Sequence, residues 1–381
     1  MKMSDENTPL LTDESETFKP SKRKSHSSSR KFKFIILPTL LLIILIYSVS
    51  KYVSHNQQVA RDEARTQWLL HTPLKLRLYT NNIRFDNINY PDKYEKPWTL
   101  RKKQVINSID FNTALGHANI VCLQEVLDHQ LHDILDGLNK NNKDEWTYYG
   151  VGRTDGLKKG EYAPVLYKKS DWLLLDNQTF WLSETPERPS KGWDAALERI
   201  VTMVTLQSHI NPLIKINVFN THFDHRGRLA RKRSAQLIVD RMENYNGYPS
   251  FLCGDFNTEP SDQPYHVLTK AGFKDSRLLI DKDYSYGDET TFTGFDKDNE
   301  PESSIIDYIW SPYFSRSNFN DSSIPEEDKI QTYNYYNLDH HLYYDIGIKQ
   351  FGILHNFFKG FHFSDHRPVA ASYEIRRTRL F

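Results

Sequence analysis

The sequence predicts an α+β fold in which two β-sheets stack as an α/β sandwich flanked by helices. Two observations support this prediction. From Leu74 onward, short apolar runs of strand length recur at close spacing, and segments with helical periodicity lie between them. Strands and helices mixed in this way are typical of sheets whose outer faces are covered by helices. The apolar content of 38% is sufficient for the core of one large domain or two ordinary ones among the 381 residues.

The individual elements are predicted from alternation for strands and from a spacing of three to four residues for helices. Leu74–Thr80 (LKLRLYT) alternates as a half-buried strand does, and Leu100–Phe111 has apolar residues at helical spacing. Ala118–Val126 is apolar over most of its length and is expected to be a buried strand. The remaining predicted elements are helices at His129–Leu138 and Ala230–Tyr245 and strands at Ala163–Lys168, Arg199–Ser208, Ile214–Phe223, Pro249–Phe256, Ser304–Trp310 and Pro368–Ile375.

One segment near the N-terminus is long and apolar enough to cross a membrane. Residues 34–53 contain a single charged residue, Lys51, and a helix of 20 residues spans roughly 30 Å, one hydrocarbon thickness. We therefore predict a disordered tail (1–33), a transmembrane signal anchor (34–53), a stalk (54–73) and a folded domain (74–381). A buried core helix and a cleaved signal peptide are the alternatives to the anchor.

Basic residues indicate how this segment would be oriented. Six Lys or Arg lie within residues 22–33, and fewer follow the segment closely, so the positive-inside rule places the N-terminus in the cytosol and the folded domain in a lumen or outside the cell. Two N-x-S/T sequons, at Asn177 and Asn320, are compatible with that topology. Glu6–Leu11 (ENTPLL) resembles an acidic dileucine signal that a sorting adaptor would bind on the way to an endosome or vacuole, but a chance tail sequence explains it equally well.

The charge balance disfavours a uniformly basic domain. Residues 1–33 carry eight Lys or Arg and five Asp or Glu, Lys51 adds one more cation, and the whole chain is neutral, so residues 52–381 have a net charge of −4. Proteins that bind duplex nucleic acid usually present a basic face. With a net charge of −4, residues 52–381 can present a basic surface to nucleic acid only as a local patch. Cys122 and Cys253 lie in apolar runs and are expected to be buried free thiols.

Polar residues of a few chemical types stand at the ends of the predicted strands. Phe251–Asn257 (FLCGDFN) ends on Asp255 and Asn257, which alternation would place on one side of a continuing strand. Any one such residue could be a turn or capping residue. Together they indicate a site, because loops at one edge of a sheet are where sites are commonly built. The others are Asn82, Glu125, His222, Asp307, Asp365 and His366.

These donor types favour a hard cation, since carboxylate and amide oxygens suit Mg²⁺ or Mn²⁺. The sequence lacks a Cys/His cluster for structural zinc, and residues 221–225 (THFDH) match only part of a dinuclear zinc signature. The G-x-S-x-G motif of serine hydrolases and the glycine loops of nucleotide-binding proteins are absent as well.

Six motifs occur in a fixed order: TNNIRFD, LQEV, VFNTHFD, GDFNTEPSD, IDYIW and SDHRPV. In this order they resemble the endonuclease/exonuclease/phosphatase superfamily, which includes deoxyribonuclease I, apurinic endonucleases, deadenylases, inositol polyphosphate 5-phosphatases and neutral sphingomyelinases. The resemblance extends from about Leu76 to Ile375, and residues 151–169 are similar to a little-characterised subgroup of short bacterial and fungal members. It implies a sandwich of the deoxyribonuclease I-like type and Mg²⁺- or Mn²⁺-dependent hydrolysis of a phosphoester.

The resemblance also implies roles for the metal and for the attacking water. Glu125 matches the principal metal ligand, helped by Asn82 and Asp365. Asp255 resembles the residue that positions or deprotonates the attacking water.

Other matching residues would act on the phosphate. Asn257 resembles a donor to a phosphate oxygen, and His366, oriented by Asp307, resembles the histidine that contacts the phosphate or transfers a proton. His222 matches the second phosphate-side histidine. Two residues of the subgroup motif are implied as substrate contacts, namely Arg153 and Glu161.

The motifs leave the natural substrate open. A nuclease acting on DNA or RNA is the default, and a lipid head group, as in a phospholipase C or sphingomyelinase, or a phosphosugar is the alternative. A catalytically inactive lumenal binding module is a further one. The aromatic residues Trp181 and Trp193 are positioned in sequence either to stack a base or sugar ring or to pack on a sheet edge. Residues 311–363, a Tyr-rich insert, are expected to form a lid or an elaborated sheet edge.

Overall fold

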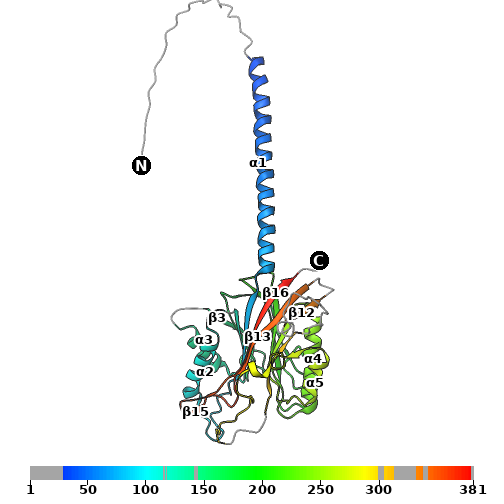
Figure 1. Cartoon of the computed structure of the whole chain (residues 1–381). Helices are drawn as coiled ribbons and strands as arrows, with labels where there is room; N and C mark the ends of the chain where they lie inside the picture. The colour runs from blue at the N-terminus through cyan, green and yellow to red at the C-terminus, as the bar shows by residue number, and fades with distance from the viewer. Residues whose placement is uncertain are drawn as a thin grey trace, which may run out of the picture. The chain divides into compact units, whose positions relative to one another are not determined.

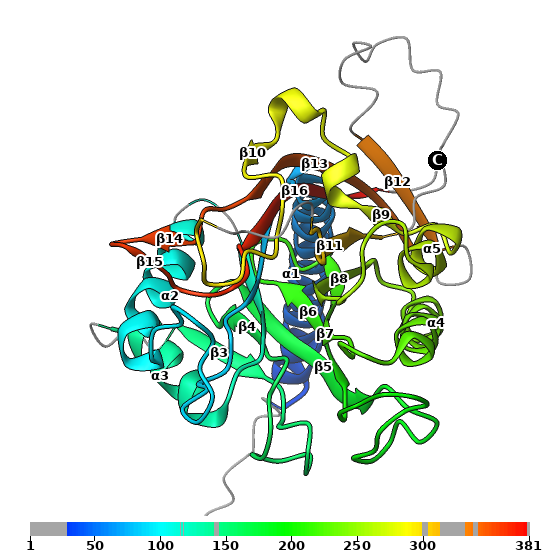
Figure 2. The same cartoon turned by 90° about the horizontal axis from the view of Figure 1, so that it is seen from below.

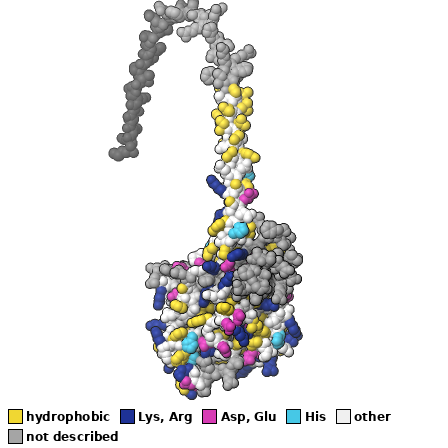
Figure 3. Space-filling model, in the orientation of Figure 1, with side chains coloured by type: hydrophobic (Ala, Val, Ile, Leu, Met, Phe, Trp, Pro, Cys, Tyr) yellow, Lys and Arg dark blue, Asp and Glu magenta, His cyan; other side chains and the backbone are white. Residues whose placement is uncertain are grey.

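The computed structural model describes residues 29–114, 116, 118–140, 145–298, 304–312, 332–337 and 342–378. The chain divides into two compact units, Met1–Ala64 and Arg65–Phe381. Helix α1 (Ser29–His71) runs through the predicted anchor and through the predicted stalk as far as His71. Its side chains from Ile36 to Val49 are exposed and largely hydrophobic (Figure 3). The helix is long and apolar enough to cross a membrane, criteria that a signal sequence near the N-terminus also meets.

The unit Arg65–Phe381 contains two large β-sheets (Figures 1 and 2). The first has the order β10-β13-β16-β1-β2-β4-β3, with β12 paired to β13, and the second has the order β5-β6-β7-β8-β11-β9. The strands of the first sheet are β1 (Leu74–Asn82), β2 (Ala118–Gln124), β3 (Trp146–Tyr149), β4 (Val165–Lys168), β10 (Tyr286–Gly287), β12 (Thr332–Asn337), β13 (Leu342–Ile353) and β16 (Val369–Thr378). Those of the second are β5 (Trp172–Trp181), β6 (Ile200–Ser208), β7 (Lys215–His222), β8 (Ser250–Asp255), β9 (Lys274–Asp275) and β11 (Asp307–Ser311).

Three apolar layers hold these elements together. Alternate side chains of both sheets, such as Leu78 and Val218, fill the space between the sheets. Helices α2 (Trp98–Asn112) and α3 (Asp128–Leu138) pack on the outer face of the first sheet, and helices α4 (Arg228–Asn244) and α5 (Gln263–Lys270) pack on the outer face of the second. Short helical turns follow β9 (Ser276–Leu278 and Lys282–Tyr284), and β14 (Phe357–Phe358) pairs with β15 (Phe361–His362).

The predicted fold class is confirmed, and most predicted elements occur with ends shifted by a few residues. Strand β5 and helix α5 were not predicted. Within the insert 311–363, β12 pairs with β13 and β13 pairs with β16, so residues 332–337 and 342–353 belong to the first sheet, as expected of an elaborated sheet edge. Cys122 and Cys253 are buried and free, as predicted. The sequon at Asn320 and the motif at Glu6–Leu11 lie outside the described residues.

Strand register brings the predicted site residues to one edge of the sandwich. In the first sheet, Asn82 and Gln124 are partners at the ends of the parallel strands β1 and β2. In the second, His222 and Asp255 are partners at the ends of the parallel strands β7 and β8. Because parallel strands end at the same edge of a sheet, the segments that follow them lie at one end of the domain.

Candidate active site

A row of polar residues crosses three neighbouring strands of the second sheet. Asp307 at the start of β11 pairs with Asp255 at the end of β8, because these strands are antiparallel, and Asp255 pairs with His222 of β7. All three are buried, with exposed fractions of 3%, 1% and 8% in that order. Register alone therefore places two carboxylates and an imidazole side by side.

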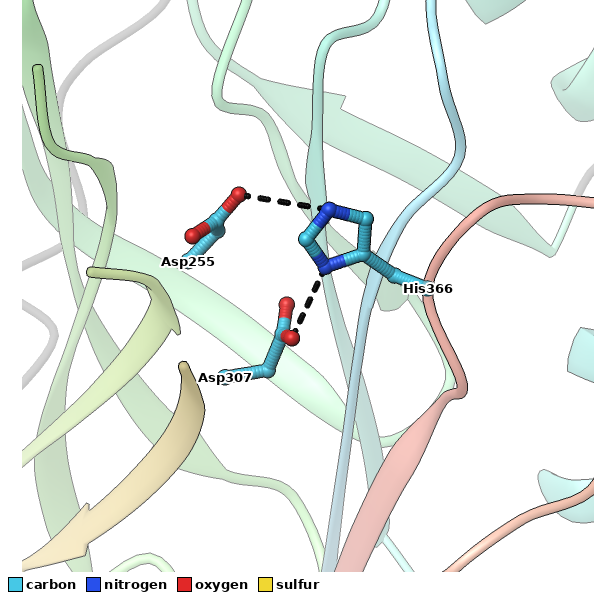
Figure 4. A group of neighbouring side chains, drawn as sticks. All are labelled: Asp255, Asp307 and His366. Carbon is cyan, nitrogen blue, oxygen red and sulfur yellow. Dashed lines mark hydrogen bonds and ion pairs between the residues drawn. The ribbon is translucent and has the colours of Figure 1, made fainter. Parts of the chain in front are cut away.

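His366 completes this half of the site from the loop before β16 (Figure 4). Its Nδ1 lies 2.8 Å from Asp307 Oδ2, and its Nε2 lies 3.7 Å from Asp255 Oδ2. Burial would lower the pKa of His366, but the carboxylates of Asp307 and Asp255 outweigh burial and raise this pKa to about 10. The ring is thus an imidazolium at neutral pH, held in one orientation by Asp307.

The pKa of Asp255 is also raised, which favours the neutral form of this carboxyl group. Burial, together with the charge of Asp307, raises the pKa of Asp255 to about 7, even though His366 and hydrogen bonds from Asn82 and Asn257 act in the opposite direction. A carboxyl group with a pKa near neutrality is suited to accept a proton at the working pH of most enzymes.

The first sheet contributes an amide and a carboxylate. Asn82, the last residue of β1, donates from Nδ2 to Glu125 Oε1 (3.1 Å) and to Asp255 Oδ2 (3.0 Å), so it links the two sheets. The backbone N–H of Phe85 donates to Glu125 Oε2 at 3.1 Å. Glu125 follows β2 with a left-handed φ of 58°, a conformation that costs a non-glycine residue about 1–3 kcal/mol. This backbone turn directs the carboxylate into the site.

Asp365 joins the site through an arginine. Arg84 Nη1 lies 3.9 Å from Asp365 Oδ2 and 4.0 Å from Glu125 Oε2, so one guanidinium lies between the two carboxylates. Burial raises the pKa of Glu125, but the charge of Arg84 and the hydrogen bond from Asn82 outweigh burial and lower it overall. Glu125 is therefore ionised at neutral pH.

Asn257 reaches the site by a turn and not by strand alternation. Strand β8 ends at Asp255, and Asn257 has a left-handed φ of 44°. Its backbone N–H donates to Asp255 Oδ1 at 2.8 Å, and its Nδ2 donates to the carbonyl oxygen of Phe223 and lies 3.0 Å from His222 Nε2. The prediction of a continuing strand was wrong because the Asp255 carboxylate caps a tight turn here.

His222 is connected to the subgroup motif. Its Nε2 lies 3.3 Å from Asp255 Oδ2, and its Nδ1 lies 3.8 Å from Glu161 Oε2. Arg153 donates from Nη1 and Nη2 to both oxygens of Glu161, each at 2.7 Å. Burial first, and then the charges of Arg199 and Arg153, hold the pKa of His222 well below its usual value, so this ring is neutral.

Gly254 permits the close approach of β8 to β7 just before Asp255. It has a φ of 150°, and a Cβ at this position would lie 2.1 Å from the carbonyl oxygen of Thr221. A side chain there would push apart the two strands that carry Asp255 and His222.

All ten predicted site residues therefore belong to one connected group of contacts. Three arginines of this region were not singled out from the sequence. Arg84 lies within the motif TNNIRFD, which could have drawn attention to it. Arg101 donates to backbone carbonyls around the site, and Arg199 Nη2 lies 3.2 Å from His225 Nδ1, but no local pattern marks either residue.

The donor set fits a hard divalent cation. Ligand atoms of Asp255, Asp307 and His366 lie within 4.8 Å of one another, and Glu125 and Asp365 form an adjoining pair. Burial is the largest cause of the raised pKa of both Asp255 and Asp365, so burial disfavours the ionised form of each carboxyl group. A cation bound to carboxylate oxygens would stabilise the ionised form.

Comparison with known proteins agrees with this geometry. Residues 82–366 match the model of the Endonuclease/Exonuclease/phosphatase family, which covers the chain from Asn82 to His366. The chain belongs to this family. Its members are hydrolases that act on phosphoester bonds and typically use divalent metals.

Two curated relatives are exonucleases by name. The chain is 29% identical over 181 residues to the probable RNA exonuclease NGL3 of Saccharomyces cerevisiae, covering 45% of this chain and 34% of that protein. It is 20% identical over 275 residues to the CCR4-Not complex 3'-5'-exoribonuclease subunit Ccr4 of Aspergillus niger, covering 56% of this chain and 41% of that one. The chain thus matches less than half the length of these relatives.

Bacterial structures match over nearly their whole length. A family protein from Bacteroides thetaiotaomicron has a TM-score of 0.64 and 28% identity, with 80% of this chain and 98% of that chain covered. The mannosyl-6-phosphatase Bt3783 of the same organism has a TM-score of 0.61 and 27% identity, with 78% and 99% covered. These structures share the two-sheet sandwich described above.

Proposed function

We propose that the chain is a divalent-metal-dependent phosphodiesterase of the nuclease type, which cleaves DNA or RNA by direct attack of water. The observation that carries this proposal is that two pairs of residues contact Asp255. Asn82, which donates to Glu125, also donates to Asp255, and His366, which is held by Asp307, lies against the same carboxylate. The exonuclease relatives favour a nucleic acid as the substrate.

Glu125 and Asp365, with Asn82, would hold the cation, since their oxygens are hard ligands and Glu125 is already ionised. Bound Mg²⁺ or Mn²⁺ supplies charge neutralisation on the scissile phosphate and stabilises the leaving oxygen. Asp307 is assigned to His366 instead, because its Oδ2 accepts the hydrogen bond from His366 Nδ1.

Asp255 accepts the proton of the attacking water, a role that its raised pKa suits. The imidazolium of His366, held by Asp307, neutralises charge on the phosphate as the bond to the leaving oxygen breaks. Neutral His222 lies against the Asp255 carboxylate, and the side-chain amide of Asn257 lies against His222, so both would contact the phosphate from the other side.

The test uses the full chain, purified in detergent, with Mg²⁺ or Mn²⁺. Bis-p-nitrophenyl phosphate reports diester cleavage, and single-stranded RNA and DNA report nuclease activity. We expect turnover that EDTA abolishes and that Glu125→Ala and Asp255→Ala reduce by at least about 100-fold. Asp110→Ala, an exposed acid on α2, is the control and should leave turnover unchanged. Turnover that persists in both site variants would refute the proposal.

A phosphosugar phosphatase is the second candidate, favoured by the near-complete coverage of Bt3783. The discriminating substrates are mannose 6-phosphate and p-nitrophenyl phosphate. Faster cleavage of these monoesters than of any diester would replace the nuclease by a phosphatase while leaving the roles of the residues in place.

We further propose that α1 anchors the protein as a type II membrane protein with the folded domain in the lumen. The apolar helix supports this, and so does Asn177, an exposed sequon residue on β5. Resistance to carbonate extraction and an endoglycosidase-sensitive mass shift that disappears in Asn177→Gln are expected. Release of the protein by carbonate would contradict the anchor.

A further inference from the structure

A basic groove lies beside the candidate active site, where helices α4 and α5 begin. Its volume is about 400 Å³. The two helices lie side by side, as both views show (Figures 1 and 2). The residues that line the groove are Arg228, Leu229, Arg231 and Lys232 of α4 and Asp262, Gln263 and Pro264 at the start of α5.

The groove adjoins the site through the two strands that carry His222 and Asp255. Arg228 follows His222 by six residues, and Gln263 follows Asp255 by eight. Six residues span at most about 20 Å, so the α4 side of the groove lies within that distance of His222 along the chain. A ligand that spans up to about 20 Å can therefore reach from the site to the α4 side of the groove.

Cations dominate the lining. Arg228, Arg231 and Lys232 are spaced i, i+3 and i+4, so they lie on one face of α4. Arg231 donates from Nη1 to the carbonyl oxygen of Asp224 at 2.9 Å. Both Arg228 and Lys232 belong to α4, and their side chains make no hydrogen bond or ion pair with the described part of the chain. Asp262 is the lining carboxylate, and its Oδ2 accepts a hydrogen bond from the backbone N–H of Glu259.

The start of α4 is rich in cations. Residues 226–233 contain five Lys or Arg and no acid, and the first turn of α4 contains no acidic residue. The N-terminus of this helix is capped from another segment, because the Asp194 carboxylate accepts hydrogen bonds from the backbone N–H groups of Leu229 and Ala230. Residues 226–233 form the local basic patch that remained compatible with the net charge of residues 52–381.

A ligand with one phosphate can place that phosphate either at the site or in the groove. A phosphosugar carries one phosphate, whereas a nucleic acid strand presents a phosphate at every nucleotide. Three cations on one helix face suit successive phosphates better than one small anion.

We propose that this groove binds phosphates of an oligonucleotide strand at a distance from the cleaved bond, so that the enzyme prefers nucleic acid chains of several nucleotides over short phosphoesters. This inference rests on the proposed nuclease function, because the active site must cleave the same strand. Arg228 and Lys232 are then residues that determine substrate length.

The decisive comparison is between two double variants of the full chain in detergent. Arg228→Gln/Lys232→Gln removes two groove cations. The matched control, Arg233→Gln/Lys103→Gln, removes two exposed cations that do not line the groove. The probes are 5'-fluorescein RNA and DNA strands of 2, 4, 8 and 12 nucleotides, and bis-p-nitrophenyl phosphate.

Binding is measured by fluorescence anisotropy in EDTA, so that it does not depend on turnover. Each phosphate contact on a single strand contributes about 0.7 to the slope of log affinity against log salt. The groove variant should therefore lose about 1.4 in slope, which corresponds to about 25-fold in affinity for the 12-mer at 0.1 M salt. The dinucleotide should bind both variants alike. Parallel titrations with RNA and with DNA show which type of nucleic acid the groove binds more tightly.

Turnover separates the groove proposal from the proposed function. With Mg²⁺, kcat/KM for wild type should rise with strand length, and the groove variant should lose this rise while cleaving bis-p-nitrophenyl phosphate normally. Equal affinities and salt slopes in the two double variants overturn the groove proposal even if bis-p-nitrophenyl phosphate is cleaved. Length-dependent binding without any metal-dependent cleavage supports the groove and refutes the nuclease function.

Discussion

Arg101 is the residue whose replacement tests most directly how the fold supports the site. Its side chain on α2 is fully buried, and its guanidinium donates to backbone carbonyls of two segments that flank the site. The acceptors are the carbonyl oxygens of Ile83 (2.7 Å), Arg84 (3.1 Å), Phe85 (3.3 Å), Lys96 (2.8 Å) and Phe363 (3.0 Å). The first three follow Asn82, and the last precedes Asp365. Arg101 therefore connects the two segments that carry these proposed cation ligands.

We predict that Arg101→Met destabilises the folded domain by about 3–5 kcal/mol. Methionine keeps an apolar stem but leaves five carbonyl groups without their donor, and removing one partner of a buried charged network costs about this amount. The carbonyls cannot all regain water without moving, because the surrounding residues are packed. In a domain of this size each kcal/mol lowers Tm by roughly 2–4 °C, so Tm should fall by about 10 °C.

Differential scanning fluorimetry of the full chain measures this change, and Arg233→Met, an exposed arginine of α4, is the control. A second readout is the Mg²⁺ concentration at half-maximal stabilisation, which should rise in Arg101→Met because the loop that holds Asn82 is released. If Arg101→Met melts within about 2 °C of the control and binds Mg²⁺ as wild type does, the reasoning from buried carbonyls is wrong.

Three further variants test single features of the site. Gly254→Ala should destabilise the domain by at least about 1–3 kcal/mol in urea unfolding, because its Cβ would lie 2.1 Å from the carbonyl oxygen of Thr221. Asp307→Asn should lower kcat at least about 100-fold with little change in circular dichroism, because His366 loses its orientation and charge partner. Asp224→Asn should remove acid-sensitive stability. Burial raises the pKa of Asp224, but backbone N–H groups and Arg199 outweigh it and lower this pKa to about 2, so wild type should lose more stability than the variant does from pH 4 to 2 in urea unfolding.

The site residues could be predicted because they stand directly after apolar strands. Asn82, Glu125 and His222 each end or follow a strand whose last five or more residues are buried, and the position of a polar residue after an apolar run is visible in the sequence. Strand β5 was missed for the opposite reason. It is an edge strand with exposed residues and a register shift between Leu174 and Asp176, so its apolar pattern does not alternate.

Other features depend on contacts that no local pattern records. Arg101 and Phe363 are 262 residues apart, and a buried arginine on a helix looks in the sequence like an exposed one. The left-handed backbone at Glu125 and Asn257 is equally hidden, because side chains at both positions are ones that strands and turns accept. Sequence therefore predicted ten side chains that the fold brings together, and the tertiary structure determined how they are oriented.

The same raised pKa values predict how stability depends on pH in the absence of metal. The pKa of Asp255 is raised from its usual value near 4 to about 7, and that of His366 from about 6.5 to about 10. In both cases the folded state binds the proton more tightly than the unfolded state does. The Asp255 contribution is fully present below about pH 4 and is lost as pH rises through 7, and the His366 contribution is fully present below about pH 6.5 and is lost as pH rises through 10.

The free energy of unfolding in EDTA should therefore fall between pH 5 and pH 9 in urea titrations, and the fall should be smaller in Asp255→Asn, which lacks the first titration and weakens the second. A cation that binds the carboxylates competes with the protons. Saturating Mg²⁺ should then stabilise wild type more at pH 9 than at pH 5. Parallel pH profiles for wild type and Asp255→Asn, with equal Mg²⁺ stabilisation at both pH values, would show that the buried carboxylates are neutralised within the protein and that the cation is bound elsewhere.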